Sequence, residues 1–139
     1  ITHNPKDKTT YFKSRPNDKG YNQLHLNVFY DLCSRKYTDA IIQPGRLKNE
    51  NNAMCRLIDR YSGQPAIFIA DRGYENYNIF AHAEHKGMYY LIRVKDVTSN
   101  GIASNLTMMP KYDEFDEWVN ITLTRKQTNE VKENLENTE

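Results

Sequence analysis

The sequence predicts an α/β fold in which a mixed β-sheet is flanked by helices. Segments with the two-residue alternation of strands and segments with a helical period follow one another as strand, strand, helix, strand, helix, strand. A hairpin followed by strand–helix units is typical of a mixed sheet with helices on its faces. The length of 139 residues is that of one domain and is sufficient for a hydrophobic core.

The first predicted strands form a hairpin. Residues 1–22 are rich in Lys, Asp, Asn and Pro without a clear period, so we expect an irregular segment there. Residues 23–32 alternate and predict a half-buried strand, and residues 37–43 predict its antiparallel partner. One face of the first strand is expected to be buried and the face with His25 and Asn27 to be exposed. The residues expected on the buried face are Leu24, Leu26, Val28, Tyr30 and Leu32.

Two helices are predicted by their apolar spacing and their end signals. Residues 49–61 carry Met54, Leu57, Ile58 and Tyr61 at helical spacing, with Asn49 or Asn51 as the cap. We expect Met54, Leu57 and Ile58 to pack against the hairpin. Residues 76–86 predict a second helix, which ends at Gly87.

The remaining strands differ in character. Residues 66–70 form a continuous apolar run, which predicts a strand buried on both faces, and residues 88–94 predict another strand. Residues 118–124 alternate and predict a strand in a second, β-rich part of the chain. Residues 125–139 contain too few apolar side chains to bury a face, and we expect them to be loosely held.

Charge is distributed unevenly along the chain. Residues 1–47 hold eight Lys and Arg against four Asp and Glu, whereas residues 96–139 hold four against nine. A basic front and an acidic tail fit a polyanion-binding body joined to a segment with a different use. The longest apolar run is too short to span a bilayer, so no membrane partner is expected. The two cysteines form no disulfide framework, and they and the four histidines show no zinc-site spacing.

The strongest chemical signal is Asp71, which directly follows the apolar run. Ligand groups of α/β sheets gather at the carboxyl ends of strands. A carboxylate at such a position suits Mg²⁺, which prefers oxygen ligands, and Gly73 allows a sharp turn and a close approach. The structural alternatives for Asp71 are a helix N-cap and a salt bridge with Arg72.

Four segments carry a resemblance to a known family. They are Tyr21-Asn-Gln-Leu-His-Leu-Asn-Val-Phe-Tyr-Asp-Leu, Asp39-Ala-Ile-Ile-Gln-Pro, Ile69-Ala-Asp-Arg-Gly-Tyr and Gly87-Met-Tyr-Tyr-Leu-Ile-Arg-Val-Lys. Together they resemble the DDE transposases of bacterial insertion sequences, in the subgroup whose ribonuclease-H-like catalytic core contains a β-rich insertion. The resemblance implies a partial ribonuclease-H-like core over residues 1–97 and the start of the β-rich insertion over residues 98–139.

The resemblance implies an enzyme for DNA strand cleavage and transfer. Three acidic residues would hold two Mg²⁺ (or Mn²⁺) ions, and Asp71 matches the second of the three. The first stands in an Asp-Gly-Ser/Thr stretch and the third in a Tyr-x-x-Arg-x-x-x-Glu motif, and neither motif occurs in this sequence. The chain therefore resembles the middle of a transposase, and we expect it to be inactive alone. The implied partners are transposon-end and target DNA and a second copy of the enzyme, in the bacterial cytoplasm with the nucleoid.

Basic residues beside Asp71 have two interpretations. Arg72 and Arg93 are candidates for DNA phosphate contacts, the interactions that position a protein on a duplex. The structural alternative pairs Arg93 with Asp71 or Glu75. At the level of the whole chain, the alternative to a transposase is a catalytically inactive ribonuclease-H-like domain that binds nucleic acid or serves a structural role.

Overall fold

The computed structural model describes residues 3–96, 98–105, 116 and 118 and confirms a mixed α/β chain. Its two helices are α1 (Glu50–Arg60) and α2 (Tyr77–His85). Three short 3₁₀ turns are η1 (Gly45–Leu47), η2 (Arg72–Tyr74) and η3 (Ile102–Asn105). The strands are β1 (Tyr11–Phe12), β2 (Tyr21–Asn22), β3 (Leu24–Asp31), β4 (Lys36–Pro44), β5 (Ile67–Ala70) and β6 (Tyr89–Ile92).

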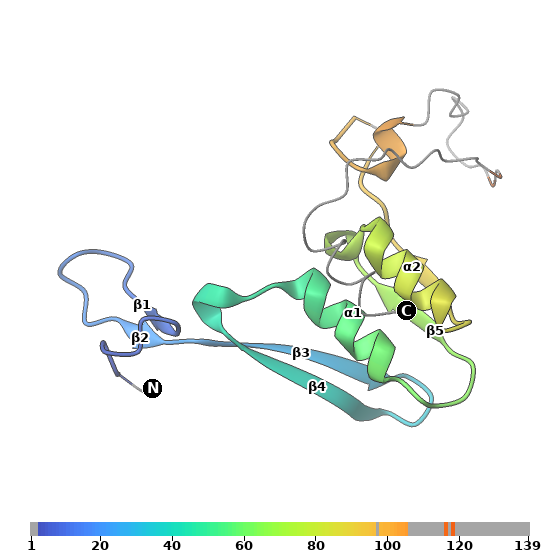
Figure 1. Cartoon of the computed structure of the whole chain (residues 1–139). Coiled ribbons are helices and arrows are strands. Elements are labelled where there is room, and N and C mark those ends of the chain that lie inside the picture. The colour runs from blue at the N-terminus through green and yellow to red at the C-terminus, as the bar shows by residue number, and fades with distance from the viewer. Residues whose placement is uncertain (1–2, 97, 106–115, 117, 119–139) are drawn as a thin grey trace.

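The described strands pair into three two-stranded ladders (Figure 1). β3 and β4 form the expected antiparallel hairpin, β5 and β6 pair in parallel, and β1 and β2 form a small antiparallel ladder. Both pairing directions of a mixed sheet are therefore present. The single continuous sheet that the element order predicts is not formed by the described residues, because β3 and β5 are not hydrogen-bonded to each other.

The first and last residues of both helices lie within one residue of the predicted ones. Interactions at the helix termini explain these boundaries. The Asn49 side chain accepts a hydrogen bond from the Asn52 backbone N–H at the start of α1. Gly87, with φ +65°, follows α2, and its N–H donates to the Glu84 carbonyl at 2.8 Å. A residue with a Cβ is strained in that left-handed conformation, which explains why a glycine ends this helix.

The core lies between the helices and the strand ladders. Its larger cluster contains Met54, Cys55, Ile58, Phe68, Ile79 and Ala83, and its smaller cluster contains Ile41, Ala53 and Leu57. Phe29 packs against both clusters, and its ring stacks on Phe68 with 5.1 Å between centroids. The hairpin and the β5–β6 ladder are therefore held together by side-chain packing beneath α1.

The prediction for the buried face of β3 is wrong. Leu26 is 59% exposed, and Leu24, Val28 and Tyr30 are also exposed, whereas Asn27 is only 6% exposed. The reason is that α1 packs on the side of the hairpin that carries Asn27, Phe29 and Ile41. Met54, Leu57 and Ile58 are buried as expected, but they contact the opposite face of the strand.

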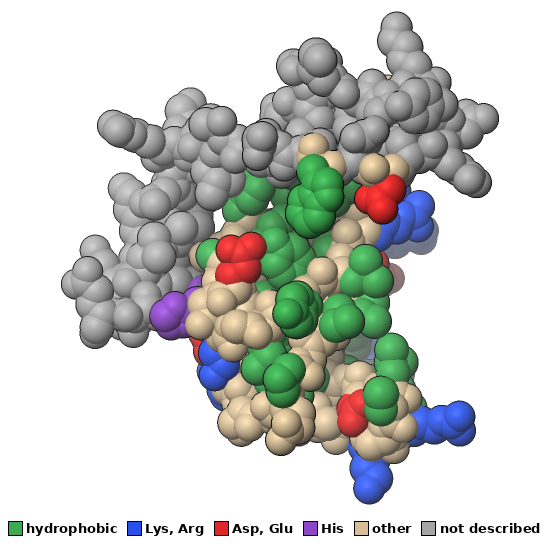
Figure 2. Space-filling model, turned by 90° about the vertical axis from the view of Figure 1, so that its right-hand side faces the viewer, with side chains coloured by type: hydrophobic (Ala, Val, Ile, Leu, Met, Phe, Trp, Pro, Cys, Tyr) green, Lys and Arg blue, Asp and Glu red, His purple; other side chains and the backbone are tan. Residues whose placement is uncertain are grey.

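The prediction that residues 66–70 are buried on both faces is also wrong. Phe68 is buried against the helices, whereas Ile67 and Ile69 are exposed. Their partners across the ladder, Tyr89 and Leu91, are exposed as well. Helices cover one face of this ladder, and within the described residues nothing covers the other. Hydrophobic side chains accordingly gather on the surface shown in Figure 2.

The N-terminal end of the chain differs from the expectation, and most of the C-terminal end lies outside the described residues. The prediction of an irregular segment over residues 1–22 is wrong in part, because these residues contain the β1–β2 ladder. We call residues 3–23 the N-terminal lobe. The predicted strand at 118–124 lies outside the described residues except for Trp118, which is exposed. The described residues 98–105 form a turn and η3. In the described part of the chain, no helix is long and apolar enough to cross a membrane.

Candidate functional site

The candidate site is built around Asp71, at the carboxyl end of β5. Asp71 is exposed, and its Oδ1 accepts a hydrogen bond from the Gly73 N–H at 2.8 Å. Its backbone carbonyl accepts a bond from the Tyr74 N–H at 3.1 Å, so Asp71 caps the short η2 turn. The second carboxylate oxygen accepts no hydrogen bond from any described residue. Asp71 thus has the capping role that we considered as an alternative, and it keeps one oxygen for a ligand.

Gly73 accommodates the close approach of the Asp71 carboxylate. A Cβ on Gly73 would lie 3.0 Å from Asp71 Oδ1, which is tighter than ordinary van der Waals contact. The glycine therefore lets the backbone N–H of the turn reach the carboxylate. This arrangement orients the side chain that the sequence singles out.

Tyr74 joins the site to the core and to α1. Its ring is half-buried and packs against the larger core cluster. Burial raises the pKa of the Tyr74 phenol above its ordinary value, and the negative charges of Glu50 and Asp71 raise it further. Contact between η2 and α1 brings together the turn that Asp71 caps and the helix whose first turn carries Glu50.

Glu50 is the residue of this site that the sequence analysis missed. It stands in the first turn of α1, where its Oε1 lies 3.4 Å from His25 Nε2 and 3.2 Å from Lys48 Nζ. Acidic residues are common in the first turn of a helix because they interact favourably with the helix dipole. The sequence therefore held no signal that Glu50 lies near Asp71 rather than simply near a helix end.

Glu75, which follows η2, binds the backbone of the segment after β6. Its Oε2 accepts a hydrogen bond from the Lys95 backbone N–H at 2.8 Å, and its Oε1 accepts one from the Ile102 N–H. These bonds attach the segment after β6 to the residue that follows η2. Lys95 is thus held through its backbone N–H.

Arg72 and Arg93 lie at the same end of the β5–β6 ladder as Asp71. Arg72 follows Asp71 directly, and the Arg93 N–H donates to the Ala70 carbonyl at 3.3 Å. Both residues are exposed, and neither guanidinium is within ion-pair distance of a described carboxylate. The ion pairs of Arg72 with Asp71 and of Arg93 with Asp71 or Glu75 are therefore not formed, and both side chains are available to a ligand.

The described residues of this site offer a divalent cation one ligand and not a complete set of ligands. The free oxygen of Asp71 is a suitable hard ligand for Mg²⁺ or Mn²⁺. In the residues that the structure describes, no three His, Cys, Asp or Glu side chains gather as a metal site would require. These residues by themselves do not fit a two-ion centre.

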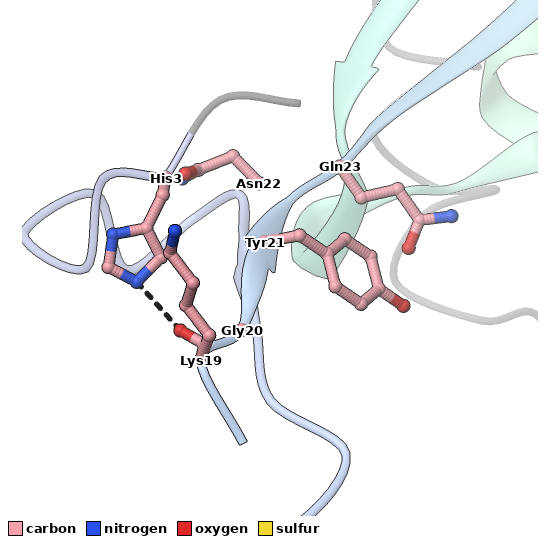
Figure 3. A pocket seen from close by; sticks show the side chains of 6 residues that line it. All are labelled: His3, Lys19, Gly20, Tyr21, Asn22 and Gln23. Carbon is pink, nitrogen blue, oxygen red and sulfur yellow. Dashed lines mark hydrogen bonds between the residues drawn. The ribbon is translucent and has the colours of Figure 1, made fainter.

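A separate hollow lies in the N-terminal lobe. It has a volume of about 640 Å³ and is lined by His3, Lys19, Gly20, Tyr21, Asn22 and Gln23. His3 and Lys19 lie on one side of β2, where His3 Nε2 is hydrogen-bonded to the Lys19 carbonyl at 2.6 Å, and Tyr21 and Gln23 project on the other (Figure 3). The hollow shares no residue with the Asp71 site.

Comparison with known proteins gives one match. The family model described as "Transposase DDE domain" matches residues 2–136, which is nearly the whole chain. No curated protein and no solved structure matches.

Proposed function

Because the chain belongs to the transposase DDE domain family, we propose that it is the part of a transposase that contributes Asp71 to metal-dependent DNA strand cleavage and transfer. The observation that carries the proposal is the position of Asp71. It follows a strand of the family-matched region, is exposed, and has one carboxylate oxygen without a described hydrogen-bond partner. In α/β sheets, ligand-binding side chains cluster at the carboxyl ends of the strands.

In this mechanism the residues of the chain hold the metal ion and orient the DNA phosphates. Asp71 would hold the ion with its free oxygen, while the Gly73 N–H fixes the other oxygen. Bound divalent ions would supply an activated attacking oxygen and would neutralise charge on the phosphodiester. Arg72 and Arg93, both exposed at this end of the ladder, would bind phosphates beside the scissile bond. Two further acidic residues complete the ion site in the family, and neither of their motifs is present in residues 1–139.

We assign the same family architecture to the chain as part of this proposal. Residues 1–97 are a partial ribonuclease-H-like core, and residues 98–139 begin a β-rich insertion. In such a core a further strand lies beside the strand that bears the second acidic residue. The pairing of β5 supports this assignment, because among the described strands β5 pairs only with β6 and leaves its other edge open.

The partners follow from the same proposal. The substrates are transposon-end and target DNA, and the enzyme acts as a homodimer on DNA in the bacterial cytoplasm, associated with the nucleoid. The family match and the exposed arginines at the Asp71 site support a DNA partner.

The test is Asp71→Asn in the full-length enzyme. Asparagine caps a helix as well as aspartate does, so the hydrogen bond to Gly73 is retained and only the carboxylate is lost. We expect nicking of transposon-end DNA in Mg²⁺ to fall by a factor of at least about 1,000, since catalytic metal sites contribute several kcal/mol to the transition state. Binding to the same DNA in a gel shift should stay nearly unchanged, because basic side chains on phosphates provide most of the affinity.

The matched control is Asp96→Asn, which removes an exposed carboxylate that is outside the η2 turn. It should leave both nicking and binding intact. Undiminished nicking by Asp71→Asn would remove Asp71 from the metal site and leave it as a helix cap. Binding without nicking in the unaltered enzyme would favour the non-catalytic alternative.

A further inference from the structure

The N-terminal lobe carries an excess of positive charge on its surface. Within residues 3–23 there are five basic residues, Lys6, Lys8, Lys13, Arg15 and Lys19, against two acidic ones, Asp7 and Asp18. All five basic residues are exposed, whereas both acidic residues are half-buried. The basic residues of the lobe are therefore more exposed than its two acidic residues.

Both carboxylates are used within the lobe. Asp7 accepts hydrogen bonds from the hydroxyls of Thr9 and Thr10, at 2.7 and 2.5 Å, and these bonds hold its pKa below the ordinary value. Asp18 Oδ2 accepts a bond from the Arg15 backbone N–H at 2.9 Å. None of the five basic side chains of the lobe lies within ion-pair distance of a described carboxylate. Five basic against two acidic residues leave the lobe with a net charge of +3, and none of its basic side chains is paired within the described chain.

The lobe is attached to the end of the hairpin by specific bonds. The Gly45 N–H donates to the Gln23 carbonyl at 2.9 Å, and the Arg46 N–H donates to the Thr9 carbonyl at 3.0 Å. The Arg46 guanidinium donates to the Tyr11 carbonyl at 2.7 Å and lies over the Phe12 ring, 5.2 Å from its centroid. These contacts position the charged surface relative to β3 and β4.

The lobe projects from the end of the β3–β4 hairpin that lies nearest the start of α1. It leads into the start of β3 and contacts η1, which follows the end of β4 and precedes α1 (Figure 1). The first turn of α1 carries Glu50, whose Oε1 lies 3.4 Å from His25 Nε2 on β3, and α1 also contacts η2, the turn that Asp71 caps. The start of β3, the start of α1 and the end of β5 therefore share one end of the core.

We propose that the N-terminal lobe is a DNA-binding surface, which holds the phosphodiester backbone of the same duplex whose strand lies at Asp71. The proposal rests on the proposed function for the identity of the polyanion. Its own basis is the net positive charge of the lobe, whose basic side chains form no described ion pair, and the attachment of the lobe to the hairpin end that precedes α1. Lysine and arginine contacts to phosphates release counterions and provide affinity that is independent of base sequence.

The test is the triple substitution Lys8→Gln, Arg15→Gln, Lys19→Gln in the 139-residue chain. Fluorescence anisotropy with a short labelled duplex is measured over a series of salt concentrations. The plot of log K against log salt should become less steep by about 2–3 for three lost phosphate contacts. At about 0.1 M salt the affinity should fall roughly 10- to 100-fold, and by the same factor on an unrelated DNA sequence.

The matched control removes the same charge elsewhere. Arg35→Gln, Lys36→Gln, Arg56→Gln changes three exposed basic residues, one in the β3–β4 turn, one at the start of β4 and one on α1, away from the lobe. This variant should keep the affinity within about twofold and the slope of the unaltered chain. A second variant, Lys8→Arg, Arg15→Lys, Lys19→Arg, keeps the charge of the lobe and should bind like the unaltered chain.

Three outcomes would overturn the inference: no duplex binding by the unaltered chain, equal losses in the lobe and control triples, or an equally large loss in the charge-keeping variant. Each of these is a binding measurement. The proposed function is judged by nicking in the Asp71→Asn enzyme, which leaves the lobe unchanged. Failure of one proposal is therefore distinguishable from failure of the other.

Discussion

Asn27 shows how a polar residue can occupy a core position at a cost. It is 6% exposed, and its Nδ2 donates to the Gln43 side chain at 3.2 Å and to the Ile41 carbonyl at 3.4 Å. Its Oδ1 is buried without a hydrogen-bond partner among the described residues. A buried carbonyl oxygen that has lost its water and gained no donor destabilises the folded state.

We therefore expect Asn27→Val to raise the free energy of unfolding by about 1 kcal/mol, since it removes the unsatisfied oxygen and places a β-branched residue in a strand. Gln43 Oε1 keeps its bond from the Asn49 N–H in this variant. Urea denaturation measures the change. Asn27→Asp is the contrasting variant, and it should be less stable because it buries a charge. A destabilised Asn27→Val would mean that the Gln43 contact outweighs the cost of the bare oxygen.

At the scale of the element, β3 shows that alternation identifies a strand but not its buried side. Phe29 lies on the covered face and contacts both core clusters, whereas Leu26 is 59% exposed on the other face. The helix that covers the hairpin is α1, and its position decides which alternate set of side chains is buried.

We expect Phe29→Ala to lower the free energy of unfolding by about 2–4 kcal/mol, because it removes an aromatic ring that stacks on Phe68. Leu26→Ala, on the same strand, should lower the free energy of unfolding by less than about 1 kcal/mol, because the Leu26 side chain is mostly exposed and its removal takes away little buried area. Thermal denaturation of the two variants side by side measures the difference. If Leu26→Ala lowered the free energy of unfolding more than Phe29→Ala, the buried face of β3 would be the one that the sequence predicts.

At the scale of the whole molecule, the described chain leaves apolar surface and strand edges uncovered. Leu26, Ile69 and Leu91 are exposed on the faces of β3, β5 and β6 that the helices do not cover. Within the described residues, β3 and β5 are each hydrogen-bonded to one strand only. An apolar face beside an open strand edge favours pairing with another chain.

We therefore expect the isolated 139-residue chain to self-associate at micromolar concentration, as measured by sedimentation velocity. Leu26→Lys, Ile69→Lys, Leu91→Lys should reduce the association without lowering the melting temperature, because these side chains are outside the core clusters. The matched control is Arg56→Lys on α1, which should associate like the unaltered chain. A monodisperse monomer with a high, cooperative melting transition would contradict the expectation.

The candidate site was predictable in part. Asp71, Arg72 and Arg93 stand where the sequence places the ends of two strands, and the structure brings them to one end of the β5–β6 ladder. Glu50 was not predictable, because 21 positions separate it from Asp71 and only the packing of η2 against the start of α1 brings both near Tyr74.

Local sequence accounts for the helices of the chain and for their caps. The helical spacing of Met54, Leu57 and Ile58, the Asn49 cap and the left-handed Gly87 are consequences of backbone geometry within a few residues. Only the tertiary structure decided that β3 buries Asn27 rather than Leu26 and that the strands pair as separate ladders. The physical reason is that both faces of a strand are equivalent until a distant element covers one of them, and local sequence does not specify where that element packs.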